Sequence, residues 1–277
     1  MPRRFRLLLR PKVLHERGLP EGSGIGVRAA LLEAVERHDR STAAWLHDRP
    51  GLRPYCVTPI MGIDRRQRSG PHVDIGISLD DLVEGFRHVL TGIEVLKVGQ
   101  SSFYVTGVEE AGAPYGELLS GAPASRRWSV RFVEPTTVRT TGPGTVRSQP
   151  LPTPEAIFGS LLHRWRAFSS VALPESVEGA VLNQVQVDFG SIQVKKAKVV
   201  PERHDPARPA QREAGCVGTV TYSVGGSPPP STDTLRGIGA LLLLGGLCGA
   251  GDRTAVGMGV IEPFPDAGRP PPRTARR

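Results

Sequence analysis

The amino-acid sequence predicts an α+β protein made of two successive units with the same order of elements. The first observation is that strand-like runs and helical patterns follow one another as β-α-β-β-α-β between residues 1 and 111. The second is that this order returns between residues 128 and 265, after a turn-rich stretch at residues 112–127 that we interpret as a linker. The order is that of the ferredoxin-like (RRM-like) layout, so we expect two tandem ferredoxin-like domains. Residues 266–277, rich in proline and arginine, are expected to form a disordered basic tail.

The elements of the first unit follow from the spacing of apolar residues and from turn residues. A short helix is expected to be started by Asp39 or Ser41 and stopped by Pro50-Gly51, and another helix opens at Asp80. The expected strands are residues 4–10, 53–60, 73–79, 93–98 and 102–108, and the expected helices are residues 27–35, 42–47 and 80–90.

The second unit contains two helices with clear apolar stripes. The first is capped by Thr153 and carries Trp165 and Phe168, which we interpret as core residues. His163, Arg164 and Arg166 of the same helix are expected to be solvated. The expected strands are residues 128–133, 136–140, 185–200, 216–224 and 254–262, with the second helix running from residue 234 to a glycine at 249.

Composition narrows the class of protein. The chain has 35 Lys plus Arg against 27 Asp plus Glu, a net charge of +8, and a pI of about 9.9, which favours an anionic partner such as nucleic acid. Cys56, Cys216 and Cys248 are far apart and show no metal-binding or disulfide pattern, so we expect no metal, no cofactor and a reducing environment. No apolar run is long enough to span a bilayer or to act as a signal peptide, so a cytoplasmic protein without a membrane partner is expected.

The longest apolar run ends in a glycine-rich loop, in which Gly249-Ala250-Gly251 and Gly257-Met258-Gly259 bracket a polar insert of five residues. Glycine permits positive φ and close approach of a polyanion to backbone N–H groups, and arginine supplies a planar fork for phosphate. The loop therefore predicts binding of a phosphate backbone. The residues expected to bind are Gly249, Gly251, Arg253, Thr254, Gly257 and Gly259.

Other interpretations of the loop fit less well. A dinucleotide-binding fingerprint needs a strand before the glycines and a helix after them, and here the order is reversed. A phosphate-binding loop of the Walker type is absent, because no G-K-[ST] follows. A connector that merely tolerates glycine is the default for a single G-x-G unit, and two such units around an arginine make that interpretation weaker.

The pattern G-h-G-x5-G-h-G, with a basic residue in the insert and after an apolar helix, resembles the signature of the RAMP superfamily of CRISPR-associated RNA-binding proteins. Within that superfamily the chain is most similar to the precursor-RNA processing endoribonucleases, the sixth Cas family. The resemblance implies a double ferredoxin-like architecture and binding of CRISPR repeat RNA.

In the family that the chain resembles, a histidine ends the short helix after the first long helix, and a basic residue a few positions later opens a strand. His47 and Arg53 match this pattern. A helix C-terminus favours an imidazolium, which suits a general acid, and an arginine suits the charge that develops on a phosphorane-like transition state. Some members carry a tyrosine as general base where this chain has Leu32, and His38 is the candidate substitute. In the alternative interpretation, His47 only caps a helix and Arg53 is solvated.

Three lysines, Lys195, Lys196 and Lys198, occupy one predicted strand, with Lys196 and Lys198 on one face and Lys195 on the other. They are candidate RNA-binding residues, because one row can line a groove that follows a phosphate backbone. A solvated edge strand protected by lysines is an equally good interpretation.

The function expected from the resemblance is a metal-independent endoribonuclease that cleaves CRISPR precursor RNA within each repeat by attack of a 2′-hydroxyl. The products would be CRISPR RNAs with a repeat-derived 5′ handle. A non-catalytic RNA-binding subunit of a CRISPR effector complex is the alternative, and a nucleotide-binding enzyme is a third. Two further partners are expected: a second copy of the chain in a homodimer, and an effector complex that receives the product.

Overall fold

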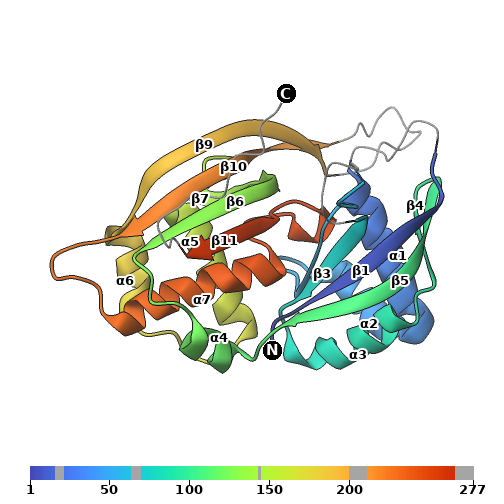
Figure 1. Cartoon of the computed structure of the whole chain (residues 1–277), viewed down its shortest axis with the longest axis horizontal. Coiled ribbons are helices and arrows are strands. Elements are labelled where there is room, and N and C mark those ends of the chain that lie inside the picture. Colours follow the sequence, from blue (N-terminus) through green and yellow to red (C-terminus); the bar gives the residue numbers. More distant parts are fainter. Residues whose placement is uncertain (16–21, 64–69, 143–144, 200–210, 266–277) are drawn as a thin grey trace.

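The structure, a computed structural model, describes residues 1–15, 22–63, 70–142, 145–199 and 211–265. Within these residues the strands form two antiparallel sheets and a separate two-stranded hairpin (Figure 1). In the second sheet the first strand lies between the third and the fourth, as in a ferredoxin-like fold, and the first sheet has the same order around its first strand with one additional strand at the edge, next to its last strand. The predicted fold class is therefore confirmed.

Five strands of the N-terminal half form the first sheet: β1 (Arg3–Val13), β2 (Tyr55–Val57), β3 (His72–Ile77), β4 (Val95–Val98) and β5 (Ser101–Gly112). Their order in the sheet is β2-β3-β1-β5-β4. In the central strand β1, Phe5, Leu7 and Leu9 are buried, whereas Arg4 and Arg6 on the other face are partly exposed. This alternation is the period of two that places one face of a sheet against a core.

Three helices complete this half: α1 (Ser23–His38), α2 (Arg40–Asp48) and α3 (Asp80–Thr91). Each contributes apolar residues to one core with the buried face of the sheet, including Leu31 of α1, Leu46 of α2 and Phe86 of α3. The short helix that the sequence predicts is α2, and it packs against α1.

Four strands of the C-terminal half form the second sheet: β6 (Arg127–Thr136), β9 (Val185–Lys198), β10 (Arg212–Val224) and β11 (Ile261–Pro265). Their order is β11-β6-β10-β9, and the hairpin of β7 (Val138–Gly142) and β8 (Thr145–Gln149) follows β6. Trp128, Val130 and Phe132 of β6 are buried at 0–1% exposure and form the floor of the second core.

The helices of this half are α4 (Tyr115–Gly121), α5 (Pro154–Phe168), α6 (Ser176–Asn183) and α7 (Thr232–Cys248). Helix α7 begins where the side chain of Ser231 accepts a hydrogen bond from the backbone N–H of Thr234, and it ends at Gly249 with a positive φ of 75°. Along α7 the residues Ile238, Leu241 and others are fully buried in the second core. None of the helices in the described residues is long and apolar enough to cross a membrane.

Two details differ from the sequence prediction. The expected strand at residues 254–262 is wrong at its start, because Thr254–Val256 form a 3-10 turn and the strand β11 begins only at Ile261. Positive φ values at Arg253, Gly257 and Gly259 break an extended path there. Within the predicted linker, Tyr115 and Leu118 of α4 are buried in the second core. The domain boundaries at 1–111, 112–127 and 128–265 stay a prediction, and the predicted tail lies outside the described residues.

The two halves approach each other through glycines. A Cβ atom added to Gly76 of β3 would lie 2.3 Å from the carbonyl oxygen of Leu247, and one added to Gly24 of α1 would lie 2.5 Å from the carbonyl oxygen of Val256. A side chain at either position would push the halves apart. Glycine there allows the end of α7 to pack directly on the first sheet and the loop after α7 to pack on α1.

Candidate active site

His47 occupies the last turn of α2, and its side chain is 67% exposed. The carboxylate of Asp48 lies 2.8 Å from the imidazole Nδ1. Because an ionised carboxylate only accepts hydrogen bonds, Nδ1 donates and Nε2 is left to meet a substrate. The arrangement has the groups that a general acid needs, an exposed ring nitrogen and a neighbour that orients the ring.

Helix α2 is fixed at its start by Asp39, one of the two residues that the sequence predicts there. Its carboxylate accepts hydrogen bonds from the backbone N–H groups of Ser41 (2.9 Å) and Thr42 (3.1 Å) and from both hydroxyls. These hydrogen bonds, the one from the Thr42 hydroxyl first, hold the pKa of the Asp39 carboxyl far below its usual range. This cap fixes the residue at which α2 begins, and so the turn of the helix on which His47 lies.

Arg53 fixes the other end of α2. Its Nη1 donates to the carbonyl oxygens of Leu46 and His47, the second at 3.0 Å. A cation at this position satisfies carbonyls that have no partner within the helix and meets the negative end of the helix dipole. Burial is the main cause that lowers the pKa of Arg53, although an arginine stays charged at neutral pH. Arg53 therefore caps the helix that carries His47 while its side chain remains partly exposed.

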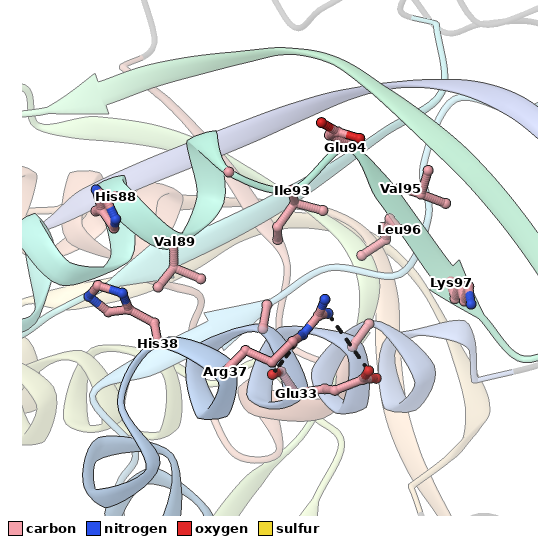
Figure 2. A pocket seen from close by; sticks show the side chains of 13 residues that line it. Glu33, Arg37, His38, His88, Val89, Ile93, Glu94, Val95, Leu96 and Lys97 are labelled. Atoms are coloured by element: carbon pink, nitrogen blue, oxygen red, sulfur yellow. Dashed lines mark hydrogen bonds and ion pairs between the residues drawn. The ribbon is translucent and has the colours of Figure 1, made fainter.

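His38 lies apart from this pair. It ends α1, and its ring stands 4.8 Å from the ring of His88 on α3, in a cavity of about 520 Å³ that Glu33 and Arg37 also line (Figure 2). His38 lies before the first residue of α2, Arg40, and His47 lies seven residues, or about 10 Å at about 1.5 Å per residue, further along that helix. The structure thus brings His47 and Arg53 together and leaves His38 in a different cavity. Its role as general base stays a prediction.

A second cavity, of about 1270 Å³, lies between the two halves of the chain. Arginines from both halves line it: Arg28, Arg49 and Arg53 from the first, and Arg139 and Arg253 from the second. The neighbour of His47, Asp48, lines it as well, as do Gly251 and Thr254 of the glycine-rich loop. A wall with this many guanidinium groups suits a phosphate backbone.

The glycine-rich loop is closed by its own hydrogen bonds. The backbone N–H of Gly251 donates to Ser160 Oγ (3.0 Å), that of Asp252 to Thr137 O (2.8 Å), and that of Gly259 to Pro135 O (3.1 Å). Because these N–H groups already have protein acceptors, they are not free to cradle a phosphate as the sequence predicts. Positive φ values explain why glycine is needed at four positions, Gly249, Gly251, Gly257 and Gly259.

The two polar residues of the loop have different surroundings. Arg253 has a φ of 58°, and its Nε and Nη2 both lie 3.2 Å from Oε1 of Glu213, so part of its fork is held by a carboxylate. Thr254 is buried at 4% exposure, and its Oγ1 accepts a hydrogen bond from Arg164 (3.1 Å). The methyl group of Thr254 faces Gly249 and Gly259, where a Cβ atom would come within 3.0 Å of it. Arg253 thus remains a candidate RNA-binding residue, whereas Thr254 is part of the interior.

The three lysines lie on the edge strand β9, paired with β10 in a regular register. The side chains of Lys195 and Lys196 are exposed, and Lys198 is partly buried beside Gly22 at the start of α1. Val199, next to Lys198, lines the cavity between the halves. The end of this strand therefore leads to the cavity, and the role of the lysines stays a prediction.

The prediction that Arg164 is solvated is wrong. Arg164 is 1% exposed and is among the largest fully buried side chains, not a solvated residue. The signal was present in the sequence, because Ile157, Leu161, Arg164 and Phe168 follow one another at helical spacing on the buried side of α5. An arginine on an apolar stripe is a candidate for a built polar contact. Other cavity residues that the sequence analysis missed are Arg28, Arg49, Arg139 and His163.

The family model described as CRISPR-associated endoribonuclease Cas6 matches residues 130–261. Solved structures match nearly the whole chain. A Thermus thermophilus Cas6 in a product complex is 23% identical, with a TM-score of 0.75, over 95% of this chain and 100% of that chain. The fold of this chain is that of the solved Cas6 structures. The resemblance inferred from the sequence is thereby confirmed.

Structures of lower sequence identity are also similar in fold to this chain. A Cas6-related protein from Pyrococcus furiosus is 14% identical, with a TM-score of 0.63, over 95% of this chain and 99% of that chain. A RAMP protein that binds different RNA substrates is 16% identical, with a TM-score of 0.55, over 95% and 99% of the two chains. No curated protein sequence matches the chain significantly.

Proposed function

We propose that this protein is a metal-independent endoribonuclease that binds CRISPR repeat RNA and cleaves CRISPR precursor RNA within each repeat. The match to the Cas6 family model and the Cas6 fold support the class of enzyme. The solved Cas6 product complexes and a substrate-mimic complex support RNA as the substrate class. The products are CRISPR RNAs with a repeat-derived 5′ handle, which pass to an effector complex.

The single observation that carries this proposal is the position of Arg53. It lines the cavity between the halves together with the glycine-rich loop, and its guanidinium holds the last turn of α2, which carries His47. A phosphodiester in that cavity near the end of α2 would meet an always-charged group and an exposed imidazole. These are two of the elements that a metal-free cleavage of RNA needs, charge stabilisation and a proton donor.

In the proposed reaction the 2′-oxygen of the nucleotide before the cut attacks the adjacent phosphorus in line. The bond from O2′ to phosphorus forms while the bond from phosphorus to O5′ breaks, which leaves a 2′,3′-cyclic phosphate and a 5′-hydroxyl. His47 gives the proton from Nε2 to the leaving O5′, and Asp48 keeps the ring oriented. Arg53 stabilises the charge on the non-bridging oxygens. The proton of the 2′-hydroxyl passes to a general base, a role that stays a prediction for His38, which lies in a different cavity.

The test is cleavage of the host's repeat RNA in excess EDTA by the wild type and by His47→Ala. We expect cleavage without added metal by the wild type, and a fall of about 100-fold or more in the variant, the usual effect of losing a general acid. RNA binding by the variant should stay within a few-fold of the wild type. Full activity of His47→Ala would place the acid elsewhere, and a wild type that cleaves nothing in EDTA would refute the proposal.

One observation favours the alternative, a non-catalytic RNA-binding subunit of an effector complex. The guanidinium of Arg53 is used to cap α2, and several loop N–H groups are used within the protein, so both have structural uses that require no reaction. A repeat RNA with a 2′-deoxy nucleotide before the cut distinguishes the two functions. An enzyme binds this RNA but leaves it uncut, whereas a binding subunit treats the two RNAs alike and cuts neither.

A further inference from the structure

Arg164 forms a buried polar junction between the two halves of the chain. It projects from α5, and its side chain is 1% exposed. Nη1 donates to the carbonyl oxygen of Arg53 (3.2 Å) and to Oγ of Ser78 (3.2 Å), and Nη2 donates to Oγ1 of Thr254 (3.1 Å). One guanidinium thus holds three chain segments: the approach to β2, the end of β3 and the glycine-rich loop.

Among the described residues, this guanidinium donates hydrogen bonds to one carbonyl oxygen and two hydroxyl groups, and none of these acceptors is a carboxylate. A buried charge with neutral partners is costly, so a core that only needed filling would be better served by an apolar residue. The fork geometry of arginine explains the choice, because its donors point in fixed, different directions and can hold segments that a single ammonium group cannot span.

The contacts continue from Arg164 to the candidate general acid. Arg164 holds the backbone carbonyl of Arg53, and the side chain of Arg53 holds the carbonyls of Leu46 and His47. The same Arg164 holds Thr254, whose methyl group packs on the loop glycines. The position of His47 relative to the loop therefore depends on two successive guanidinium groups, one from each half.

We infer that Arg164 is a positioning residue for RNA cleavage, which sets the distance between the loop and the Arg53–His47 pair through its hydrogen bonds to Arg53 and Thr254. This inference rests on the proposed function. The consequence is that loss of Arg164 slows the chemical step more than it weakens RNA binding, because the groups that touch RNA remain and only their relative placement changes. A misplacement of about 1 Å is enough to cost about 100-fold in rate.

The experiment measures the single-turnover cleavage rate and the RNA dissociation constant of Arg164→Met, Arg164→Lys and Arg166→Met. Arg166 is the matched control, because it lies on the same helix, two residues on, with its side chain 59% exposed in a pair with Glu178. We expect Arg164→Met to cleave about 10- to 100-fold more slowly, with a dissociation constant within about 3-fold of the wild type. Arg164→Lys should recover part of the rate, since it restores the charge but not the fork. Arg166→Met should behave as the wild type.

Rates are taken per folded molecule, below the melting temperature of each variant, so that loss of stability alone leaves them unchanged. A normal rate for folded Arg164→Met would overturn the inference, as would a fall in rate that is matched by an equal loss of RNA affinity. Amide hydrogen exchange gives a readout that does not depend on cleavage. Exchange at residues 49–55 should become faster in Arg164→Met and stay unchanged in Arg166→Met. A wild type that does not cleave would refute the proposed function, and unchanged exchange would still refute the positioning role.

Discussion

Substitution of Gly24 by alanine tests whether the loop is placed by close contact with α1. A Cβ atom on Gly24 would lie 2.5 Å from Val256 O and 2.7 Å from the Cα atom of Gly257. Both are backbone atoms, so the clash cannot be relieved by rotating a side chain. The loop and the start of α1 would have to separate by about 1 Å, and overpacking of this kind costs about 1–3 kcal/mol.

Alanine is also the better helix former, which offsets up to about 1 kcal/mol of that cost. We therefore expect Gly24→Ala to lower the free energy of unfolding by up to about 3 kcal/mol and the melting temperature by up to about 12 °C. The cleavage rate should fall by about 10- to 100-fold, because the loop moves relative to Arg53.

The matched control is Gly85→Ala in the middle of α3. A Cβ atom on Gly85 would have no heavy atom within 4 Å, so only the helix preference acts. The free energy of unfolding of this variant should rise by about 1 kcal/mol, and its cleavage activity should equal that of the wild type. Thermal melting, urea unfolding and single-turnover cleavage of both variants provide the measurement. A Gly24→Ala protein as stable and as active as Gly85→Ala would refute the contact as the determinant of the loop position.

Other substitutions test three separate features. Asp39→Ala removes the cap of α2 and should lower the urea concentration at the midpoint of unfolding, whereas Asp39→Ser should keep most of the wild-type midpoint. Burial raises the pKa of Glu134 from 4.5 to about 7, so the folded protein holds this proton where the unfolded chain has lost it. The resulting stability is full below about pH 4.5 and is lost as the pH rises through 7. Between pH 5 and pH 8, the free energy of unfolding measured in urea should therefore rise by about 1–2 kcal/mol in Glu134→Gln relative to the wild type. The same pH dependence in both proteins would contradict this. A double Lys195→Gln, Lys196→Gln variant should bind RNA about 2- to 10-fold more weakly, with a smaller dependence of the dissociation constant on KCl concentration in polarisation titrations.

The order of elements could be predicted from the sequence because it depends on local signals. Apolar spacing and caps such as Asp39 and Ser231 are visible within a few residues, and both caps are present in the structure. The start of the last strand was predicted wrongly because the run from Thr254 is apolar enough for a strand. Its conformation is decided by positive φ at Arg253 and Gly257, which an apolar pattern does not report.

The candidate site was predictable only in part. His47 and Arg53 came from a local pattern, and the structure places them together through a helix cap. The surroundings of the loop N–H groups and of Arg164 depend on residues about 90 to 110 positions away, such as Ser160 and Arg53. Contacts over that separation are set by the packing of the two sheets, and no single stretch of sequence contains them.

The glycine contacts between the halves also set an order for folding during synthesis. Residues 249–265 are made after every other element of both sheets, and they supply both the loop that packs on Gly24 and the strand β11 that pairs with β6. Until they emerge from the ribosome, α1 lacks its contact with the loop and β6 has an unpaired edge, the kind of exposed surface that chaperones protect. The cavity between the halves therefore forms only after residues 251–256 have been made, so a nascent chain gains its candidate site only after the strands β1–β10 have been made.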